Sequence, residues 1–254
     1  MQIHVVAQGD TISSIARNYG VSERMITEDN QLIPPYSLVV GQALYIATQQ
    51  STPSESISVG GYAYPFISDW VLDQTLPFLS DLLIFSYGFM QDGTLIAPTI
   101  DPQKMIQKAL AQNVKPILTL TPLDEKGNFN NLLIKELVNQ EDSIVRLLTQ
   151  LQEEMVSKGY QGVNIDFEFI LAEDKDAFTA FVQRVASTMR PLGYETSVAL
   201  APKTSADQQG AVYVGKDYPA LGAAADSVLL MTYEWGYTYD RYCHRGSVAA
   251  GILG

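Results

Sequence analysis

The sequence predicts an α/β fold, an incomplete (β/α)8 TIM barrel of about six strands preceded by a small strand-helix-helix-strand domain. Three observations lead to this prediction. Short apolar runs alternate with amphipathic stretches after residue 57, as in parallel α/β sheets and barrels. A polar segment without periodicity, residues 48–56, has the composition of a linker. The length of 254 residues suits one large domain or two smaller ones.

The composition excludes several classes of protein. Hydrophobic residues make up 46% and charged residues 17%, which is typical of a folded chain rather than a disordered one. The formal net charge of −12 would repel a phosphate backbone, so we expect no nucleic-acid partner. No apolar run approaches the roughly 18 residues of a membrane helix, so we expect no membrane span. The oligomeric state leaves no signal in the sequence.

Metal sites and cofactors are not expected either. The sequence holds a single cysteine, Cys243, and two histidines, His4 and His244. These residues are too few for a zinc cluster, a disulfide framework or a histidine-based catalytic set. Carboxylates are therefore the side chains on which catalysis would depend.

The first domain, residues 2–47, has start and stop signals for each of its elements. Asp10 or Thr11 can cap the first helix, and Gly20 can end it. Asn30 and the prolines that follow it break the second helix into a loop. The expected elements are strands at 3–6 and 43–46 and helices at 11–19 and 22–30.

This first domain resembles the LysM module. The resemblance rests on the run from Val6 to Ile12, followed by Ile15-Ala16, Tyr19, Asn30, Leu38, Gly41-Gln42, Leu44 and Ile46. It implies binding of N-acetylglucosamine-containing glycan, either peptidoglycan or chitin. The binding groove would lie between the loop Gly9-Asp10-Thr11 and the loop from Asn30 to Leu38. Taken singly, Gly9, Asp10 and Asn30 are equally well explained as turn and cap residues.

The second domain, residues 57–239, is the barrel region. We expect strands at residues 57–64, 82–87, 116–120, 162–167, 197–200 and 228–232. The clearest helices between them are expected at residues 101–113, 141–158 and 174–192.

Candidate catalytic residues concentrate on the fourth of these strands. Alternation along residues 162–168 sends Asn164, Asp166 and Glu168 to one face, which we expect to be the barrel interior. Two carboxylates so close on a buried strand require a reason, because unpaired buried charge is unfavourable. Their mutual repulsion raises one pKa, as a general acid requires, and Glu168 stands nearer the end where barrel active sites open. The alternative is a structural ion-pair site.

The same strand resembles the signature of the family 18 glycoside hydrolases, Asp-x-x-Asp-x-Asp-x-Glu. Asp166 and Glu168 match its last two acids, whereas Gln161 and Asn164 replace the first two. Two flanking motifs support the resemblance, Ser86-Tyr87-Gly88-Phe89 and the run from Met231 to Tyr237. Together with a LysM module, this pattern resembles the bacterial spore-germination and cortex-lytic branch of the family.

The resemblance implies hydrolysis with retention, in which the 2-acetamido group of the substrate replaces an enzyme nucleophile. Glu168 would protonate the leaving oxygen and then activate water. Asp166 would orient the acetamido group and stabilise its positive charge, and Tyr233 would donate a hydrogen bond to the acetamido carbonyl. We expect Asn164 to be a substrate-binding residue. It cannot ionise, so it cannot share a proton with Asp166 as the usual aspartate does, which would alter the pH profile without abolishing the reaction.

Aromatic side chains near the strand ends are candidate sugar-binding surfaces, because a pyranose presents an apolar face to a ring. Tyr87 and Trp235 are the main candidates, with Trp70 and Tyr237 beside them. Each of them is otherwise explained as a core residue.

The C-terminal residues 240–254 do not fit the barrel pattern. The average strand-helix repeat is about 34 residues, so two further repeats would need about 68, whereas 21 residues follow Tyr233. We interpret this tail as the product of a shifted reading frame or a truncated gene, which would leave the edges of the first and sixth strands unpaired.

Two functions therefore remain open. The first is a glycosidase of N-acetylated cell-wall glycan, targeted by LysM and active in spore germination. The second is a non-catalytic peptidoglycan-binding protein with a decayed, truncated barrel. The first residues show no basic region followed by an apolar one, so we expect no signal peptide. We therefore expect assembly onto the spore coat or cortex from the mother cell, or association with the cell wall.

Overall fold

The computed structural model describes residues 2–47 and 57–232. The chain divides into two compact units, Met1–Ser56 and Ile57–Gly254. Several sequence-based expectations lie outside the described residues. These are the site residues Tyr233 and Trp235, the candidate Tyr237, the linker at 48–56 and the tail at 240–254.

The first unit has the four elements expected from the sequence. They are β1 (Gln2–Val5), α1 (Ile12–Tyr19), α2 (Glu23–Asp29) and β2 (Ala43–Ile46). Each helix begins one residue later than expected, because Thr11 and Ser22 act as N-caps. β1 and β2 pair antiparallel, and seven buried residues form a separate core with both helices. They are Val6, Ile12, Ile15, Ala16, Ile26, Leu44 and Ile46.

The second unit alternates strands and helices. Its strands are β3 (Gly60–Ala63), β4 (Asp81–Phe89), β5 (Leu95–Ile96), β6 (Lys115–Leu120), β7 (Gly162–Ile165), β8 (Glu195–Leu200) and β9 (Ser227–Leu230). Its α-helices are α3 (Asp69–Thr75), α4 (Gln103–Ala111), α5 (Leu132–Val138), α6 (Glu141–Lys158), α7 (Lys175–Met189) and α8 (Tyr218–Ala224). Residues 57–232 also contain three short 3-10 helices, η1 (Leu76–Phe78), η2 (Ala172–Asp174) and η3 (Arg190–Leu192).

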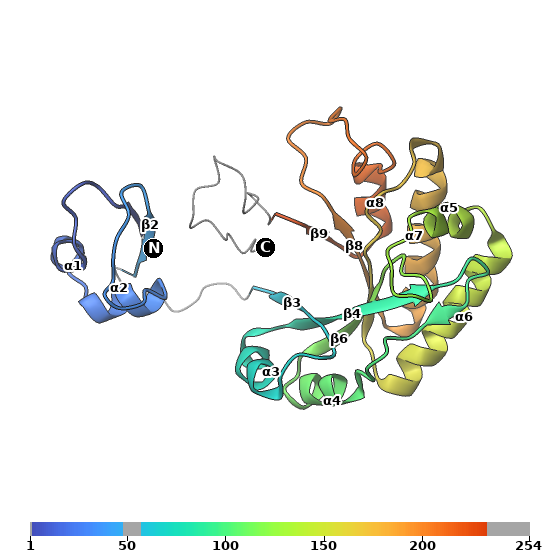
Figure 1. Cartoon of the computed structure of the whole chain (residues 1–254), viewed down its shortest axis with the longest axis horizontal. Helices are drawn as coiled ribbons and strands as arrows, with labels where there is room; N and C mark the ends of the chain where they lie inside the picture. Colours follow the sequence, from blue (N-terminus) through green and yellow to red (C-terminus); the bar gives the residue numbers. More distant parts are fainter. Residues whose placement is uncertain (1, 48–56, 233–254) are drawn as a thin grey trace. The chain divides into compact units, whose positions relative to one another are not determined.

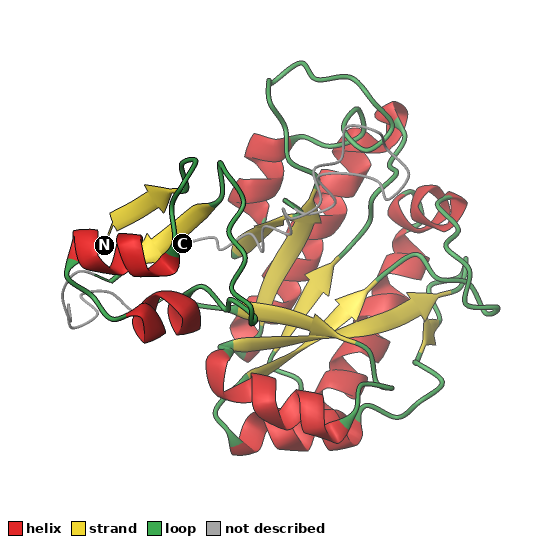
Figure 2. Ribbon diagram, turned by 60° about the vertical axis from the view of Figure 1, so that its left-hand side comes forward, coloured by secondary structure: helices red, strands yellow, loops and turns green. Residues whose placement is uncertain are grey.

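The parallel sheet of this unit runs in the order β3-β4-β6-β7-β8-β9, and β5 pairs antiparallel with the end of β4. The sheet curls, and the helices cover its outer side (Figures 1 and 2). The predicted α/β class with about six barrel strands is therefore confirmed. The carboxyl ends of the parallel strands meet at one edge of the sheet, where barrel enzymes carry their active sites.

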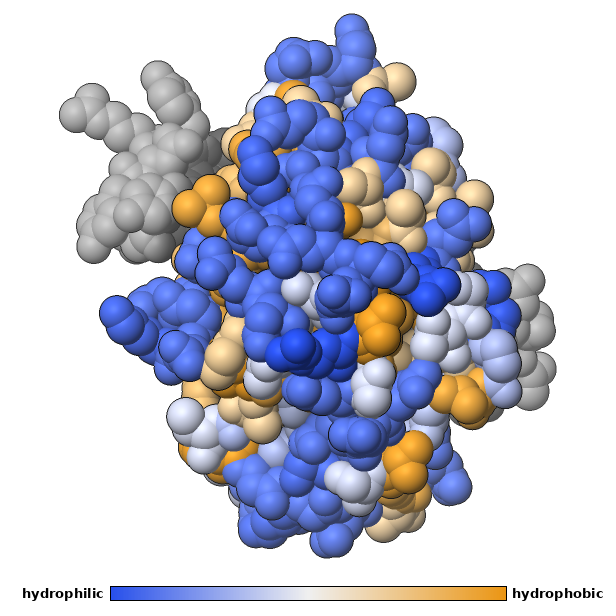
Figure 3. All heavy atoms as spheres, turned by 90° about the vertical axis from the view of Figure 1, so that its right-hand side faces the viewer, coloured by the Kyte–Doolittle hydropathy of each residue, from blue (hydrophilic) through white to orange (hydrophobic). Residues whose placement is uncertain are grey.

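The main core lies between the sheet and the helices. α6 and α7 bury apolar residues at helical spacing, such as Leu147 and Leu151 on α6 and Phe178 and Val182 on α7. The view onto the helical side is mostly hydrophilic, with isolated hydrophobic residues (Figure 3). No helix in the described part of the chain combines the length and apolar character needed to cross a bilayer.

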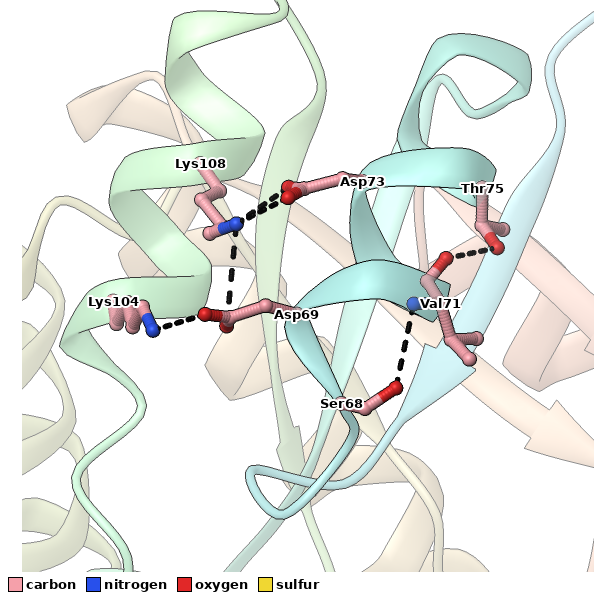
Figure 4. Close-up of polar contacts among 7 residues, drawn as sticks. All are labelled: Ser68, Asp69, Val71, Asp73, Thr75, Lys104 and Lys108. Atoms are coloured by element: carbon pink, nitrogen blue, oxygen red, sulfur yellow. Dashed lines mark hydrogen bonds and ion pairs between the residues drawn. The ribbon is translucent and has the colours of Figure 1, made fainter.

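Helices α3 and α4 are joined by ion pairs on their exposed sides (Figure 4). The Lys108 ammonium lies 2.5 Å from a carboxylate oxygen of Asp73, and Lys104 pairs with Asp69. Ser68 caps α3, since its hydroxyl accepts a hydrogen bond from the Val71 amide. These polar contacts link the two helices at their surface.

Candidate active site

The three polar residues expected on the fourth barrel strand lie along β7 and directly after it, with exposure that increases toward the carboxyl end. Asn164 is wholly buried, Asp166 is 8% exposed, and Glu168 is half-buried. The strand ends at Ile165, so both carboxylates stand just beyond it. Phe167 points to the opposite side, where its ring packs against Phe178 and Phe181 of α7. The expected alternation therefore places the two acids on the interior side of the sheet.

Asn164 is a cross-link rather than a group presented to a ligand, which corrects its expected role in substrate binding. Its amide oxygen accepts a hydrogen bond from the Tyr62 hydroxyl of β3 at 2.8 Å. Its amide nitrogen donates to Ser197 of β8, also at 2.8 Å. Both ends of the amide are used, so Asn164 ties two distant strands together through the barrel interior.

The Asp166 carboxyl is strongly perturbed by its surroundings. Its pKa is raised from 3.8 to about 6, mainly by burial and in addition by the negative charge of Glu168, whereas the positive charge of Lys216 opposes the rise. One of its oxygens, Oδ1, is buried without a hydrogen-bond partner among the described residues. The raised pKa expected for one acid of the pair is found at Asp166.

Lys216 is a site residue that sequence reasoning missed. It lies on the loop between β8 and α8, and its side chain is 3% exposed. Burial lowers its pKa from 10.5 to about 8, and the charges of Asp166 and Glu168 counteract that fall. Lysine is seldom fully buried, so the residue type argues against a buried position here. Its place two residues before α8, on a loop that follows a barrel strand, is the signal that could have indicated it.

Tyr87 does not belong to the site, which corrects the prediction of a sugar-stacking role. The ring is fully buried between β4 and α6. Its hydroxyl donates to Glu154 of α6 at 2.9 Å and accepts from Tyr160 at 3.3 Å. Burial raises the pKa of both tyrosines well above the ordinary value. Tyr87 is therefore a polar anchor in the layer between sheet and helices.

Other aromatic rings border the site. The rings of Tyr64 and Phe66 stack with centroids 4.9 Å apart, and Phe85 contacts Tyr64 edge-on at 5.1 Å. Phe85 also lies beside Phe129, which follows β6. Phe66 is 71% exposed and Phe129 is 59% exposed, which leaves their faces open to a ligand. Trp70 of α3, a secondary candidate, is exposed as well.

A separate open pocket of about 540 Å³ lies beyond the ends of β4 and β6. It is lined by Gln91 and Asp92 after β4 and by Asp124 and Glu125 after β6, among others. Neither Asp166 nor Glu168 lines it. The carboxylates after β7, not this pocket, therefore mark the candidate site.

In the first unit, the expected ligand-binding residues make hydrogen bonds and a helix cap within the domain itself. The Asp10 carboxylate accepts hydrogen bonds from the Ala7 amide at 2.6 Å and from His4 at 3.0 Å, and the backbone bond is the main cause of its lowered pKa. Thr11 caps α1, and the Asn30 amide pairs with both backbone groups of Tyr45. Gly9 adopts a φ of 92°, which favours glycine. These side chains shape the two loops of the expected groove.

The fold and the two carboxylates define a class of enzyme. The family model described as glycosyl hydrolases family 18 matches residues 43–245, and the LysM domain model matches residues 4–47. The chain therefore belongs to the family 18 glycosyl hydrolases, a family of glycosidases, and carries an N-terminal LysM domain. Both resemblances seen in the sequence are confirmed.

Individual relatives agree with this assignment. The cortical fragment-lytic enzyme of Bacillus subtilis is 32% identical over 94% of this chain and 67% of its own length. Among solved structures, the spore cortex-lytic enzyme SleL of Bacillus cereus has a TM-score of 0.72 and 27% identity, covering 93% of this chain and 66% of that one. A chitinase from Chromobacterium violaceum shares the fold, with a TM-score of 0.63 at 20% identity over 71% of this chain and 57% of that one. The chain spans about two thirds of the length of its cortex-lytic relatives.

Proposed function

We propose that the chain hydrolyses N-acetylglucosamine-containing cell-wall glycan, with spore-cortex peptidoglycan as the substrate and spore germination as the setting. The observation that carries the proposal is the pair of carboxylates after β7, one buried and one reaching the open end of the sheet. The membership in family 18 and the similarity to cortex-lytic relatives support the choice of substrate.

In this proposal, Glu168 is the general acid that protonates the leaving oxygen and later the base that activates water. Its position at the open edge suits a group that exchanges protons with substrate and solvent. Asp166 orients the acetamido group of the substrate, whose oxygen attacks the anomeric carbon, and its carboxylate faces the positive charge that develops there. Two displacements at that carbon would give retention. Tyr233 would donate a hydrogen bond to the acetamido group.

The aromatic rings at the site border would hold the sugar chain. Phe66 and Phe129 present exposed faces on the rim formed by the loops after β3 and β6. Stacking on such faces suits pyranose rings and tolerates different substituents. The LysM domain would bind the same glycan and keep the enzyme on the spore cortex or cell wall.

Product analysis tests the proposal. The full chain is incubated with purified spore-cortex peptidoglycan and, separately, with a chitin oligomer, and the fragments are identified by mass spectrometry. We expect muropeptide fragments with new N-acetylglucosamine reducing ends. Fragmentation of the chitin oligomer alone would contradict the proposed substrate. Binding to cortex with no fragmentation of either glycan would favour the non-catalytic alternative.

A further inference from the structure

Lys216 is a buried charged residue that the proposed mechanism does not use. Its side chain is 3% exposed, and Nζ has no hydrogen-bond partner among the described residues. Moving an ammonium group away from water without a partner is strongly unfavourable. A lysine in such a place requires a compensating interaction.

The compensating charges come from the acids after β7. Within the described residues, Asp166 and Glu168 are the charged groups that act on Lys216, and Glu168 and Lys216 are those that act on Asp166. Lys216 therefore carries the charge that favours the ionised form of Asp166, and Glu168 carries the charge that opposes it. The buried, unpaired oxygen of Asp166 leaves its carboxylate dependent on this charge.

The backbone holds Lys216 in this place. A Cβ atom on Gly215 would lie 2.1 Å from the carbonyl oxygen of Ile170, so the loop packs directly against the segment that follows the two acids. The Lys216 amide donates to the Tyr213 carbonyl at 3.1 Å. On the other side, Asp217 caps α8 by accepting a hydrogen bond from the Ala220 amide.

The two ends of the same loop are also joined. The Tyr218 hydroxyl at the start of α8 donates to the Ala201 carbonyl at the end of β8, at 2.6 Å. The Lys203 ammonium lies 4.2 Å from the centre of the Tyr218 ring, and its charge is not one of those that act on Asp166. The loop therefore carries two lysines with different surroundings, one facing the acids and one facing aromatic rings.

We propose that Lys216 is a positioning residue for the reaction: its buried ammonium, on a loop packed against the segment after the two acids, is the counter-charge that keeps the Asp166 carboxylate ionised beside Glu168. The inference rests on the role of Asp166 in the proposed function. An ionised Asp166 can face the positive charge that develops on the acetamido group, whereas a protonated one cannot. Lys216 itself need not touch the substrate.

A direct titration tests this proposal without any turnover. The full chain is labelled with ¹³C at aspartate carboxyl carbons, and the Asp166 signal is assigned by its loss in Asp166→Asn. We expect Lys216→Met to raise the titration midpoint of Asp166 by about one to three pH units, the usual effect of losing a nearby opposite charge. Lys216→Arg should stay near the wild-type value. Lys203→Met, the matched control on the same loop, should leave the midpoint unchanged. An unchanged midpoint in Lys216→Met would overturn the proposal.

Thermal melts at two pH values separate an electrostatic effect of Lys216 from a purely structural one. A neutral residue at 216 leaves Asp166 facing Glu168 alone, so Lys216→Met and Lys216→Gln should gain more thermal stability than wild type when the pH falls from 7 to 5. Equal pH dependence, or failure to fold at both pH values, would identify Lys216 as purely structural and overturn the proposal. The pH–rate profile then links the titration to catalysis: in Lys216→Met, the acid-side fall in rate should move to higher pH together with the Asp166 midpoint. A shifted titration in a chain that hydrolyses no glycan would refute the proposed function but not the interaction.

Discussion

Among the candidate site residues, Asp166 has an ionisation that is strongly affected by its surroundings. Its carboxyl is buried, lies near a second carboxylate and has one favourable charge, Lys216, among the described residues. A folded-state pKa near 6 lies above the unfolded value of 3.8. Its contribution to stability is therefore fully present below pH 4 and is lost as the pH rises through 6. Ionisation of Asp166 therefore lowers the stability of the fold, while it provides the negative charge that the proposed mechanism requires.

This relation gives a prediction for Asp166→Asn. From pH 5 to pH 7, ionisation of Asp166 should lower the free energy of unfolding of the wild type by about 1 kcal/mol, and the variant should lack this loss. Urea unfolding at both pH values measures the difference. An identical pH dependence in the two proteins would show that Asp166 does not titrate in this range.

A second residue-scale prediction separates two aromatic side chains. Tyr87→Phe removes a buried hydroxyl that bonds to Glu154, so it should destabilise the fold by about 1–2 kcal/mol and leave turnover unchanged. Phe66→Ala removes an exposed ring, so it should raise KM for cortex fragments with little change in stability. Thermal melts and steady-state kinetics on both variants check this pair. A raised KM in Tyr87→Phe would restore the expected role of Tyr87 in sugar binding.

Residue patterns in the sequence predicted which side chains of the β7 segment share a face, but not their contacts with other strands and loops. Strand alternation placed Asn164, Asp166 and Glu168 on one face, because side-chain direction follows the local backbone. It could not show that both ends of the Asn164 amide are used, because one partner, Tyr62, lies on the distant edge strand β3 and the other, Ser197, lies on the neighbouring strand β8. Lys216 could not be predicted either, because its burial depends on the packing of its loop against Ile170, which is distant in sequence.

At the scale of elements, the loop between β8 and α8 is held against the segment after β7 by one close approach. Gly215 leaves no room for a side chain beside the Ile170 carbonyl. Further along, the glycine of α8, Gly222, has its nearest neighbour 4.0 Å from a Cβ position. The two glycines, seven residues apart in sequence, therefore have opposite tolerance for a methyl group.

Alanine substitutions test this contact. Gly215→Ala should displace the loop, lower the melting temperature and reduce turnover, because the new Cβ meets rigid backbone. Gly222→Ala should keep activity and stabilise α8 by about 0.5–1 kcal/mol, the usual gain from replacing a helical glycine. Full activity in Gly215→Ala would show that the loop contact does not support the site.

Element boundaries were predicted best where local signals are strong. The helix at 141–158 was predicted with its observed ends, since acidic residues begin it and Gly159 adopts the left-handed conformation that ends it. β7 ends at Ile165, two residues before the expected limit, although the Asp166 amide still donates to the Leu120 carbonyl of β6 at 2.9 Å. The seven-residue helices α3, α5 and α8 were not placed individually, since helices this short show little periodicity.

At the scale of the whole molecule, two units with separate cores suggest a division of labour. The first unit belongs to the LysM domain match, and the second contains both candidate acids. The α/β class was predictable because the alternation of apolar runs and amphipathic helices extends over the whole second unit. In the described residues, β3 and β9 form the two edges of the parallel sheet. The sequence-based interpretation of residues 240–254 remains a prediction.

The measurement that tests the central claim most directly compares two glutamate variants of the full chain on cortex peptidoglycan. Glu168→Gln removes the proposed general acid, whereas Glu173→Gln alters an exposed partner of Lys135 only a few residues away. We expect Glu168→Gln to lose hydrolysis by at least about a hundredfold while still sedimenting with insoluble peptidoglycan, and Glu173→Gln to match wild type in both assays. Wild-type hydrolysis in Glu168→Gln, or equal loss of hydrolysis and binding, would contradict the assignment of chemistry to Glu168 and of binding to the LysM domain.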